Sequence, residues 1–205
     1  MREMLNFLLV GVGGQGTILA SEVLVEVGIA AGYQAKQAEV HGMSQRGGSV
    51  TSHVRWGRQV YSPLIGVGEA DVMLAFEKAE ALRSIRQLRP GGVAVINWQA
   101  IEPVTVTSGG QNYPDDDHIH TCFKQVTEHA VCIDCMSLAE SLGNAKVMNV
   151  ILLGALSMLI EVNGMTNFKL NVETWLKVIT ERVPNKYIEL NQRAFQLGRE
   201  VIASS

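Results

Sequence analysis

The chain has 205 residues, of which 47% are hydrophobic and 18% are charged, a composition typical of a folded globular protein and unlike that of a disordered chain. Its 17 basic and 20 acidic residues give a formal net charge of -3, and no two Lys or Arg residues are adjacent. This charge pattern disfavours nucleic-acid binding, and the length fits one domain over residues 1–205.

The first forty residues predict a strand, a helix and a second strand. Residues 5–10 form an apolar run that stops at a glycine cluster, as buried parallel strands do. Residues 14–31 have an apolar stripe that predicts a helix ending at Gly32, and residues 33–40 alternate as a strand does. The stripe consists of Leu19, Val23, Val27 and Ala30. The segment before the first strand lacks the long apolar region and cleavage site of a signal peptide, so we expect a cytoplasmic protein.

A loop, four further strands and a helix are expected next. Residues 41–48 show no periodicity and are rich in glycine, which predicts the loop. The strands are expected at residues 49–56, 59–62, 71–76 and 93–97, with a turn at Gly57 and Arg58 between the first two. The helix is expected at residues 77–88, where Pro90, Gly91 and Gly92 would end it.

The second half of the chain is expected to be mostly helical. After a last strand at residues 131–134, the apolar spacing predicts helices at residues 137–142, 147–162, 172–182 and 186–203. Strands that alternate with helices predict an α/β fold in three layers. We therefore expect a mostly parallel, Rossmann-like sheet with helices on both faces and a helical C-terminal part.

Two segments of this half have alternative interpretations. The acidic run Asp115, Asp116 and Asp117 fits a solvated helix start better than a metal site. The apolar run at residues 147–160 contains Asn149 and Ser157 and is too short to span a bilayer. It therefore predicts a buried helix, and we expect no association with a membrane.

The three cysteines favour a structural interpretation. Cys122, Cys132 and Cys135 cannot all pair with one another, which fits a reducing compartment with free thiols. Cys132 and Cys135 form a C-x-x-C motif, but the upstream histidines do not complete a usual zinc pattern. The motif also looks like part of a strand rather than the helix start of a redox motif. We expect no metal site.

The first candidate site is the glycine turn, which follows the G-x-G-x-x-G pattern between a strand and a helix. Its residues are Gly11, Gly13, Gly14, Gln15 and Gly16. Glycines allow a tight turn and a close approach to a ligand, and the free N–H groups of a helix start favour an anion. Glu39 stands near the position of a ribose-binding acid, yet no residue set for hydride transfer follows. A nucleotide site and a purely structural turn both remain open.

The second candidate site is the loop from residue 41 to residue 48. It combines a titratable ring, two hydrogen-bonding side chains, a guanidinium and adjacent glycines: His41, Ser44, Gln45, Arg46, Gly47 and Gly48. Arg46 is suited to binding a carboxylate or phosphate through two hydrogen bonds, and the glycines let the backbone approach the same group. The alternative is a surface loop with a solvated arginine.

Together the two segments resemble the gamma subunit or domain of 2-oxoacid:ferredoxin oxidoreductases. The turn reads GVGGQG, and the loop reads HGMSQRGG followed by SVTSHVR. The form of the loop is most similar to that of the beta subunit of indolepyruvate ferredoxin oxidoreductase. The likeness continues through residues 62–65, 70–75, 142–155 and 183–198, so it covers nearly the whole chain.

The resemblance implies a complex that oxidatively decarboxylates a 2-oxoacid, forms an acyl-CoA and reduces ferredoxin. Thiamine diphosphate, magnesium and iron–sulfur clusters would perform this chemistry. The chain has neither a Gly-Asp-Gly segment for a thiamine-bound metal nor four-cysteine runs for clusters. The resemblance therefore places these cofactors on a large alpha subunit, and it implies that this chain is inactive alone.

The resemblance also implies that the glycine turn and the loop face the subunit interface or CoA, and it identifies no catalytic residue. The substrate would be indole-3-pyruvate, converted with CoA to indole-3-acetyl-CoA and carbon dioxide. Three alternatives remain: a gamma subunit of a pyruvate or 2-oxoglutarate oxidoreductase, a free-standing NAD-dependent Rossmann enzyme, and a subunit that only shapes an interface.

Overall fold

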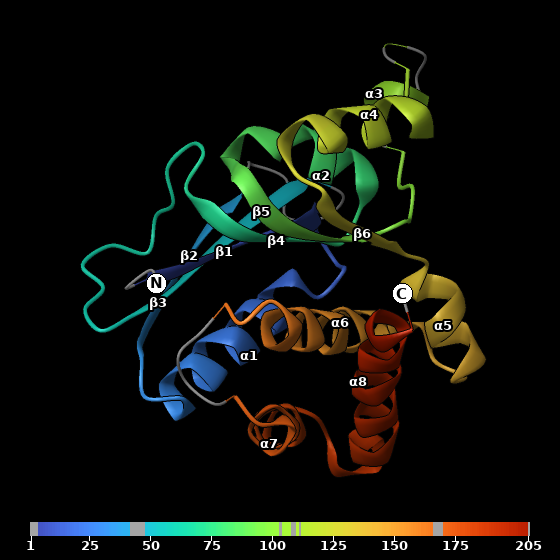
Figure 1. The fold of residues 1–205 in the computed structure, drawn as a ribbon. Helices are drawn as coiled ribbons and strands as arrows, with labels where there is room; N and C mark the ends of the chain where they lie inside the picture. Colours follow the sequence, from blue (N-terminus) through green and yellow to red (C-terminus); the bar gives the residue numbers. More distant parts are fainter. Residues whose placement is uncertain are drawn as a thin grey trace.

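A computed structural model of the chain describes residues 4–41, 48–102, 104–107, 110, 112–165 and 170–204. A six-stranded sheet lies in the middle of the molecule, with helices above and below it (Figure 1). The strands are β1 (Met4–Val12), β2 (Gln34–His41), β3 (Ser49–Gly57), β4 (Ala70–Ala75), β5 (Leu88–Asn97) and β6 (His129–Ile133). Their order across the sheet is β2-β3-β1-β4-β5-β6.

The sheet is mixed but mostly parallel, as expected. β1 pairs with β4, β4 with β5 and β5 with β6, all in the parallel sense. β3 pairs antiparallel with both β1 and β2, so among the described strands it alone runs in the opposite direction. The expected strand–helix–strand unit therefore forms, but β3 separates its two strands.

Burial distinguishes the inner strand β3 from the edge strand β2. β3 is buried along most of its length, which suits a strand that has neighbours on both sides. The sequence of β2, QAKQAEVH, is polar, which suits an edge strand that solvent can reach. The strands are consecutive, and the loop between them is too short for a crossover, so they pair antiparallel.

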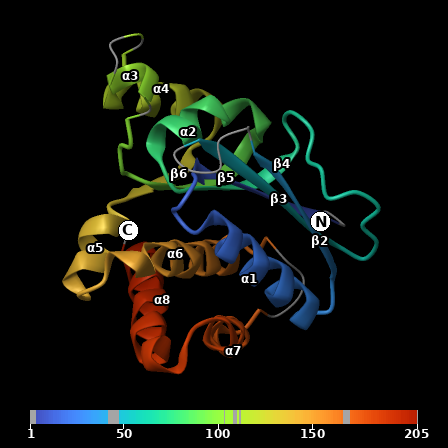
Figure 2. The same cartoon turned by 180° about the vertical axis from the view of Figure 1, so that it is seen from behind.

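Helices cover both faces of the sheet, which confirms the expected three layers. One face carries α1 (Thr17–Ala30), α6 (Met148–Val162), α7 (Val172–Arg182) and α8 (Ile188–Ala203), and the other carries α2 (Lys78–Arg83) and α4 (Asp116–Val126) (Figures 1 and 2). Two clusters of buried hydrophobic residues lie on the two faces of the sheet, and alternate residues of β1 belong to them. Phe7 and Leu9 belong to the first cluster, and Leu8 and Val10 belong to the second. The remaining helices are α3 (Val104–Thr107), α5 (Cys135–Ser141) and the 3₁₀ turns η1 (Ile85–Gln87), η2 (Ala145–Val147) and η3 (Asn185–Tyr187).

The apolar helix α6 is part of the core. By length and composition the segment Ala145–Val162 could cross a bilayer, but 72% of it is buried inside the fold. Its residues pack against the sheet and against α8, and they belong to the larger hydrophobic cluster. This confirms the buried helix predicted from the sequence.

Two local expectations were wrong. Residues 59–62 form no strand, because the backbone of the surrounding segment bonds to side chains: the Val60 N–H donates to Gln34 Oε1 at 3.0 Å and the Ile65 N–H to His53 Nδ1 at 3.1 Å. The helix expected at residues 77–88 ends at Arg83, and β5 begins at Leu88. The Pro-Gly-Gly sequence thus lies inside β5 instead of ending a helix. It falls where the pairing with β4 shifts register between Leu88 and Val93, and proline is tolerated at such an irregularity.

Helix ends were predicted more accurately. α7 has the expected bounds. Asp115 caps α4, since its side chain accepts the His118 N–H at 2.7 Å, and Asp116 and Asp117 lie in the first turn. Gly32 follows the last residues of α1 with φ of 86°, as a helix-ending glycine does.

Candidate functional site

The glycine turn lies where the chain changes direction across the sheet. β1 leads to α1 on one face, whereas the neighbouring β4 leads to α2 on the other face (Figure 1). The connections therefore diverge at the carboxyl ends of β1 and β4. In open α/β sheets this point is the usual place for a ligand.

The turn needs glycine for both conformation and space. Gly14 and Gly16 have φ of 107° and 84°, a region that side chains disfavour. A Cβ on Gly16 would lie 2.6 Å from the Asn149 side chain, and a Cβ on Gly11 would lie 2.8 Å from Phe76 Cβ. The glycines thus allow the turn to pack directly onto α6 and the end of β4.

Gln15 joins the ends of β1 and β4. Its Oε1 accepts the Val12 N–H at 2.8 Å, and its Nε2 donates to the Phe76 carbonyl at 2.8 Å and to Gln99 Oε1 at 3.2 Å. The amide is therefore fully engaged within the protein. In this conformation the Gln15 side chain ties the glycine turn to the segments that follow β4 and β5.

Asn97 extends this network and was not singled out from the sequence. It is fully buried at the end of β5, and its Nδ2 donates to the Phe76 carbonyl at 2.9 Å and to Gln99 Oε1 at 3.1 Å. Its Oδ1 accepts the Cys135 N–H at 3.1 Å, which ties the start of α5 to the same point. An asparagine at the end of an apolar strand was the available signal, but the sequence does not show which groups it meets.

The start of α1 has the electrostatics of an anion-binding surface. Gly16 supplies no side-chain cap, and the described first turn holds no acidic residue. The first N–H groups of the helix therefore have no side-chain cap, and no acidic side chain of the first turn compensates the positive end of the helix dipole. Ile18, in the same turn, is 49% exposed, so an apolar side chain lies beside this positive end.

The second candidate segment meets the glycine turn through its backbone. The Gly13 N–H donates to the Gly48 carbonyl at 2.9 Å, and His41 pairs with Val50 at the ends of β2 and β3. Ser44, Gln45, Arg46 and Gly47 lie outside the described residues, as does the side chain of His41. The structure thus brings together Gly13 and Gly48, one residue from each segment.

α2 also holds the end of this loop. The Ser49 hydroxyl donates to Glu80 Oε2 at 2.5 Å, and Arg83 pairs with Glu80 Oε1 at 2.5 Å. Glu80 is only 5% exposed, whereas Ser49 is exposed and the Arg83 side chain is 58% exposed. The entry into β3 is therefore tied to both the glycine turn and α2.

Glu77, the first acid after β4, has a structural role. One carboxylate oxygen accepts the Glu80 N–H at 2.8 Å and caps α2. The other accepts the Ile101 N–H at 3.2 Å and the Tyr113 hydroxyl. Desolvation and this hydrogen bond raise the pKa of Tyr113 well above its usual value, so the phenol stays protonated and continues to donate. Glu77 thus holds the segment after β5 against α2.

The position of Glu39 argues against a dinucleotide site. Glu39 lies on β2 and pairs with Ser52 of β3, and β3 separates it from β1. Two strand spacings, about 10 Å, thus lie between β2 and the strand that precedes the glycine turn. In the dinucleotide fold the ribose-binding acid follows a strand that adjoins the first one.

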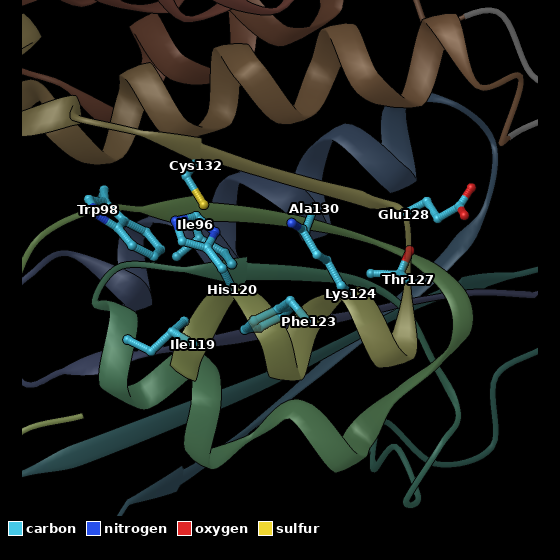
Figure 3. A pocket seen from close by; sticks show the side chains of 10 residues that line it. All are labelled: Ile96, Trp98, Ile119, His120, Phe123, Lys124, Thr127, Glu128, Ala130 and Cys132. Atoms are coloured by element: carbon cyan, nitrogen blue, oxygen red, sulfur yellow. The ribbon is translucent and has the colours of Figure 1, made fainter. Parts of the chain in front are cut away.

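A second hollow lies between α4 and β6 (Figure 3). It has a volume of about 250 Å³, and Trp98 stacks on His120 in its wall, with ring centroids 4.5 Å apart. Cys132 points its sulfur into this wall toward Ile96. Desolvation and, to a smaller degree, the Asp116 carboxylate raise the pKa of Cys132 to about 11, so its thiol is not a nucleophile at neutral pH.

The C-x-x-C motif extends beyond the strand that was expected to contain it. Cys132 lies on β6, and Cys135 is fully buried as the first residue of α5, so the motif spans the end of the strand and the start of the helix. Burial and the neighbouring Asp134 raise the pKa of Cys135 far above that of a free thiol. Across the described ranges, no three His, Cys, Asp or Glu residues lie close enough together to hold a metal ion.

Comparisons with curated proteins give close relatives of matching length. Residues 6–201 match the model of the family described as pyruvate ferredoxin/flavodoxin oxidoreductase. The indolepyruvate oxidoreductase subunit IorB of Thermococcus kodakarensis is 41% identical over 198 residues, covering 94% of this chain and 93% of the relative. The protein of the same name from Archaeoglobus fulgidus is 37% identical over 194 residues, covering 95% and 93%.

Solved structures agree with these relatives. The gamma subunit of a keto/oxoacid ferredoxin oxidoreductase from Geobacter sulfurreducens has a TM-score of 0.70 and 25% identity, covering 98% of this chain and 99% of that chain. A 2-oxoglutarate:ferredoxin oxidoreductase from Magnetococcus marinus, with 2-oxoglutarate, coenzyme A and succinyl-CoA bound, has a TM-score of 0.72 and 19% identity. That match covers 100% of this chain and 32% of the other, and it shows a common fold. The resemblance drawn from the sequence is confirmed: the chain belongs to the pyruvate ferredoxin/flavodoxin oxidoreductase family.

Proposed function

We propose that the chain is the small subunit of an indolepyruvate:ferredoxin oxidoreductase. The observation that carries this proposal is the 37–41% identity to relatives named indolepyruvate oxidoreductase subunit IorB over nearly the full length of both proteins. The complex would convert indole-3-pyruvate and CoA to indole-3-acetyl-CoA and carbon dioxide and would pass two electrons to ferredoxin. A relative named pyruvate synthase subunit PorC is 27% identical, which makes a pyruvate enzyme the weaker alternative.

The chemistry of the described residues supports placing the cofactors on a larger partner. An iron–sulfur cluster needs several thiolates at one point, whereas Cys132 and Cys135 have raised pKa values and no third ligand of the described chain joins them. Thiamine diphosphate, magnesium and the clusters are therefore assigned to a large alpha subunit, with ferredoxin acting through the complex. Residues 1–205 would act as one gamma-type domain in the cytoplasm.

The proposed role of this chain is to form one wall of the site. Gly11, Gly13, Gly14, Gln15 and Gly16 would, together with His41, Ser44, Gln45, Arg46, Gly47 and Gly48, face CoA or the partner. The uncompensated start of α1 suits the phosphate groups of CoA, and Ile18 beside it suits an apolar contact. The structure from Magnetococcus marinus has coenzyme A bound, which fits a CoA-dependent enzyme of this fold.

Reconstitution tests the proposal. The chain and a candidate large subunit would be co-expressed without oxygen, captured through a tag on this chain, and assayed for ferredoxin reduction with indole-3-pyruvate, pyruvate and 2-oxoglutarate. We expect a stable complex whose activity requires CoA and favours indole-3-pyruvate, while the isolated chain is colourless and inactive. Separate elution of the two chains, with full activity in the large chain alone, would exclude the subunit assignment.

Calorimetry addresses the Rossmann alternative. Because β3 separates Glu39 from the glycine turn, we expect no tight binding of NAD or FAD by the isolated chain. Micromolar affinity for either dinucleotide would favour the free-standing dehydrogenase instead.

A further inference from the structure

The segment between β3 and β4, residues 58–69, exposes three large apolar side chains. Tyr61 is 82%, Leu64 54% and Val67 77% exposed. Tyr61 and Met4, which is 40% exposed, line the same hollow of about 440 Å³. The segment projects from the sheet beside the start of β1 (Figure 1). A local concentration of apolar side chains in solvent is typical of a surface that another molecule covers.

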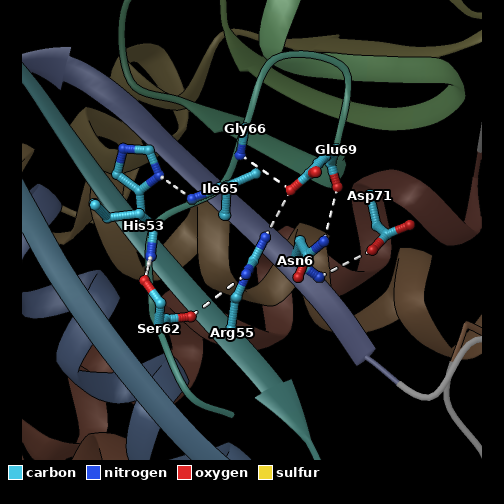
Figure 4. Close-up of polar contacts among 9 residues, drawn as sticks. Asn6, His53, Arg55, Ser62, Ile65, Gly66, Glu69 and Asp71 are labelled. Atoms are coloured by element: carbon cyan, nitrogen blue, oxygen red, sulfur yellow. Dashed lines mark hydrogen bonds and ion pairs between the residues drawn. The ribbon is translucent and has the colours of Figure 1, made fainter.

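Hydrogen bonds hold this segment against the sheet (Figure 4). The Ile65 N–H donates to His53 Nδ1 at 3.1 Å, and the Gly66 N–H donates to Glu69 Oε2 at 3.1 Å. Arg55 pairs with the same Glu69 oxygen at 2.8 Å. The segment is therefore tied at several points to β3 and to its own end.

Buried apolar residues anchor it as well. Val60 is 2% and Ile65 6% exposed, so the segment places these two side chains inside while Tyr61, Leu64 and Val67 remain outside. Tyr61, Leu64 and Val67 therefore do not contribute to the hydrophobic core of the chain. A surface already held in one conformation loses little conformational entropy when it binds a partner.

The surface around Tyr61 is positively charged, against the overall charge of the chain. Exposed Arg58 lines the same hollow, and Lys36 donates from Nζ to the Tyr61 carbonyl at 3.4 Å. Arg55 is paired with Glu69, so the local excess comes from Arg58 and Lys36. The whole chain has a net charge of -3. An aromatic residue beside an arginine is a common centre of binding energy in protein interfaces.

We propose that residues 58–69, with Met4 and Lys36, form a docking surface for the larger chain of the oxidoreductase, which presents an apolar pocket for Tyr61 with acidic side chains at its rim. This rests on the proposed function. The relatives are named as subunits, and in the Magnetococcus marinus enzyme the same fold accounts for 32% of a longer chain. A second copy of this chain is the less suitable occupant, because two cationic surfaces would then face each other.

The docking surface is separate from the glycine turn. Met4 begins β1 and Gly13 follows its end, so about 30 Å of strand lies between the two places. Substitutions in residues 58–69 should therefore weaken assembly without altering turnover in complexes that do form. Weaker assembly with unchanged turnover therefore distinguishes a docking role from a role at the glycine turn.

The test compares Tyr61→Ala, Val67→Ser and their combination with the wild-type chain. The dissociation constant for the purified large chain would be measured by calorimetry, and we expect each single substitution to raise it by about 10-fold and the pair by more. The thermal midpoint of the isolated chain should not change, because both side chains are exposed. Tyr187→Ala and Val162→Ser, at 38% and 65% exposed positions elsewhere, are the matched controls and should bind as the wild type does.

A charge reversal tests the acidic rim. Arg58→Glu should weaken binding and make the dissociation constant less sensitive to salt, because it removes an attractive contribution that salt screens. If the wild-type chain binds the large chain but the Tyr61, Val67 and Arg58 variants bind equally well, the docking surface is assigned wrongly. Loss of self-association instead of hetero-association in these variants would assign the surface to a second copy and overturn the proposal. Failure of the wild-type chain to bind at all would refute the proposed function instead.

Discussion

Gly198 of α8 lies directly against the carbonyl oxygen of Ile151 in α6. A Cβ at Gly198 would come within 2.0 Å of that oxygen, and a Cβ at Gly154 of α6 would come within 2.0 Å of the Phe195 carbonyl. Each helix thus places a glycine at the crossing, so the two backbones touch without side chains between them. This contact holds the helical C-terminal part on the sheet, because α6 packs against β5 and α8 packs against α6.

Substituting alanine for either glycine should destabilise the fold. Overpacking costs about 1–3 kcal/mol or more, and alanine returns up to about 1 kcal/mol of helix propensity, so we expect Gly198→Ala and Gly154→Ala each to lower the free energy of unfolding by roughly 2 kcal/mol. Urea denaturation measures this directly. Gln192→Ala, on the exposed side of α8, is the control and should change stability little. If Gly198→Ala leaves the free energy of unfolding unchanged, α6 and α8 can move apart without loss of stability.

Loss of the Gln15 amide should weaken the glycine turn. Gln15→Leu keeps a similar volume but leaves the Val12 N–H without the acceptor that it has at 2.8 Å, whereas the Phe76 carbonyl loses Gln15 and keeps Asn97 Nδ2 at 2.9 Å. We expect a loss of about 1–3 kcal/mol in the free energy of unfolding. Gln125→Leu, on the exposed face of α4, controls for the substitution itself. If Gln15→Leu and Gln125→Leu have the same free energy of unfolding, the hydrogen bonds of the Gln15 amide do not stabilise the fold.

The bond between His53 and Ile65 should make stability depend on pH. Burial and, to a smaller degree, the Arg55 guanidinium hold the pKa of His53 below its usual value of 6.5. The neutral His53 ring accepts the Ile65 N–H. Its contribution to the free energy of unfolding is therefore complete above pH 6.5. This contribution is lost as the pH falls from 6.5 toward the lowered pKa, because the unfolded chain then binds a proton that the folded chain does not. Denaturation at several pH values between 5 and 8 measures the slope, and His53→Asn, which keeps an acceptor near Nδ1, should flatten it.

The exposed His129 provides the control for that experiment. His129→Asn removes an imidazole without touching the segment after β3, so it should leave the slope unchanged. If wild-type and His53→Asn chains lose stability in parallel as the pH falls, His53 is not the group responsible.

Alkylation should show that Cys132 and Cys135 do not act as a redox pair. The pKa of Cys132 is raised to about 11 and that of Cys135 is raised further by burial, so few thiolates form at neutral pH. We expect iodoacetamide to modify Cys132 slowly at pH 7.5 and faster as the pH approaches 11, and to modify Cys135 only after unfolding. Peptide mass spectrometry gives the rates, with glutathione as the reference thiol. Modification of Cys132 as fast as glutathione at pH 7.5 would contradict the raised pKa.

The local parts of the structure could be predicted from the sequence. The bounds of α7, the acidic start of α4, the glycine that follows α1 and the apolar character of α6 all depend on residues within one or two turns of each other. The two candidate segments were found for the same reason, because glycines and polar residues at fixed short spacings mark a turn and a loop. The order and spacing of these segments along the chain then carried the resemblance to a known family.

Contacts between distant residues could not be predicted in this way. The place of β3 between β1 and β2 depends on which strand gains more by burial on both sides, a comparison that no single segment contains. The partners of Gln15 and Asn97, the meeting of Gly13 with Gly48, and the orientation of Tyr61 away from the core likewise depend on residues brought together only by folding.

The sequence by itself therefore determined the elements, their α/β alternation and the two glycine-rich segments, because backbone propensity and apolar periodicity are properties of neighbouring residues. Only the tertiary structure decided which backbone and side-chain groups of the glycine turn are engaged and which apolar side chains stay outside. Those outcomes depend on whether a polar group finds a partner when it is buried and on whether two backbones can touch. At Gly198 and Ile151, as at Gly13 and Gly48, the groups that meet belong to different elements of the chain.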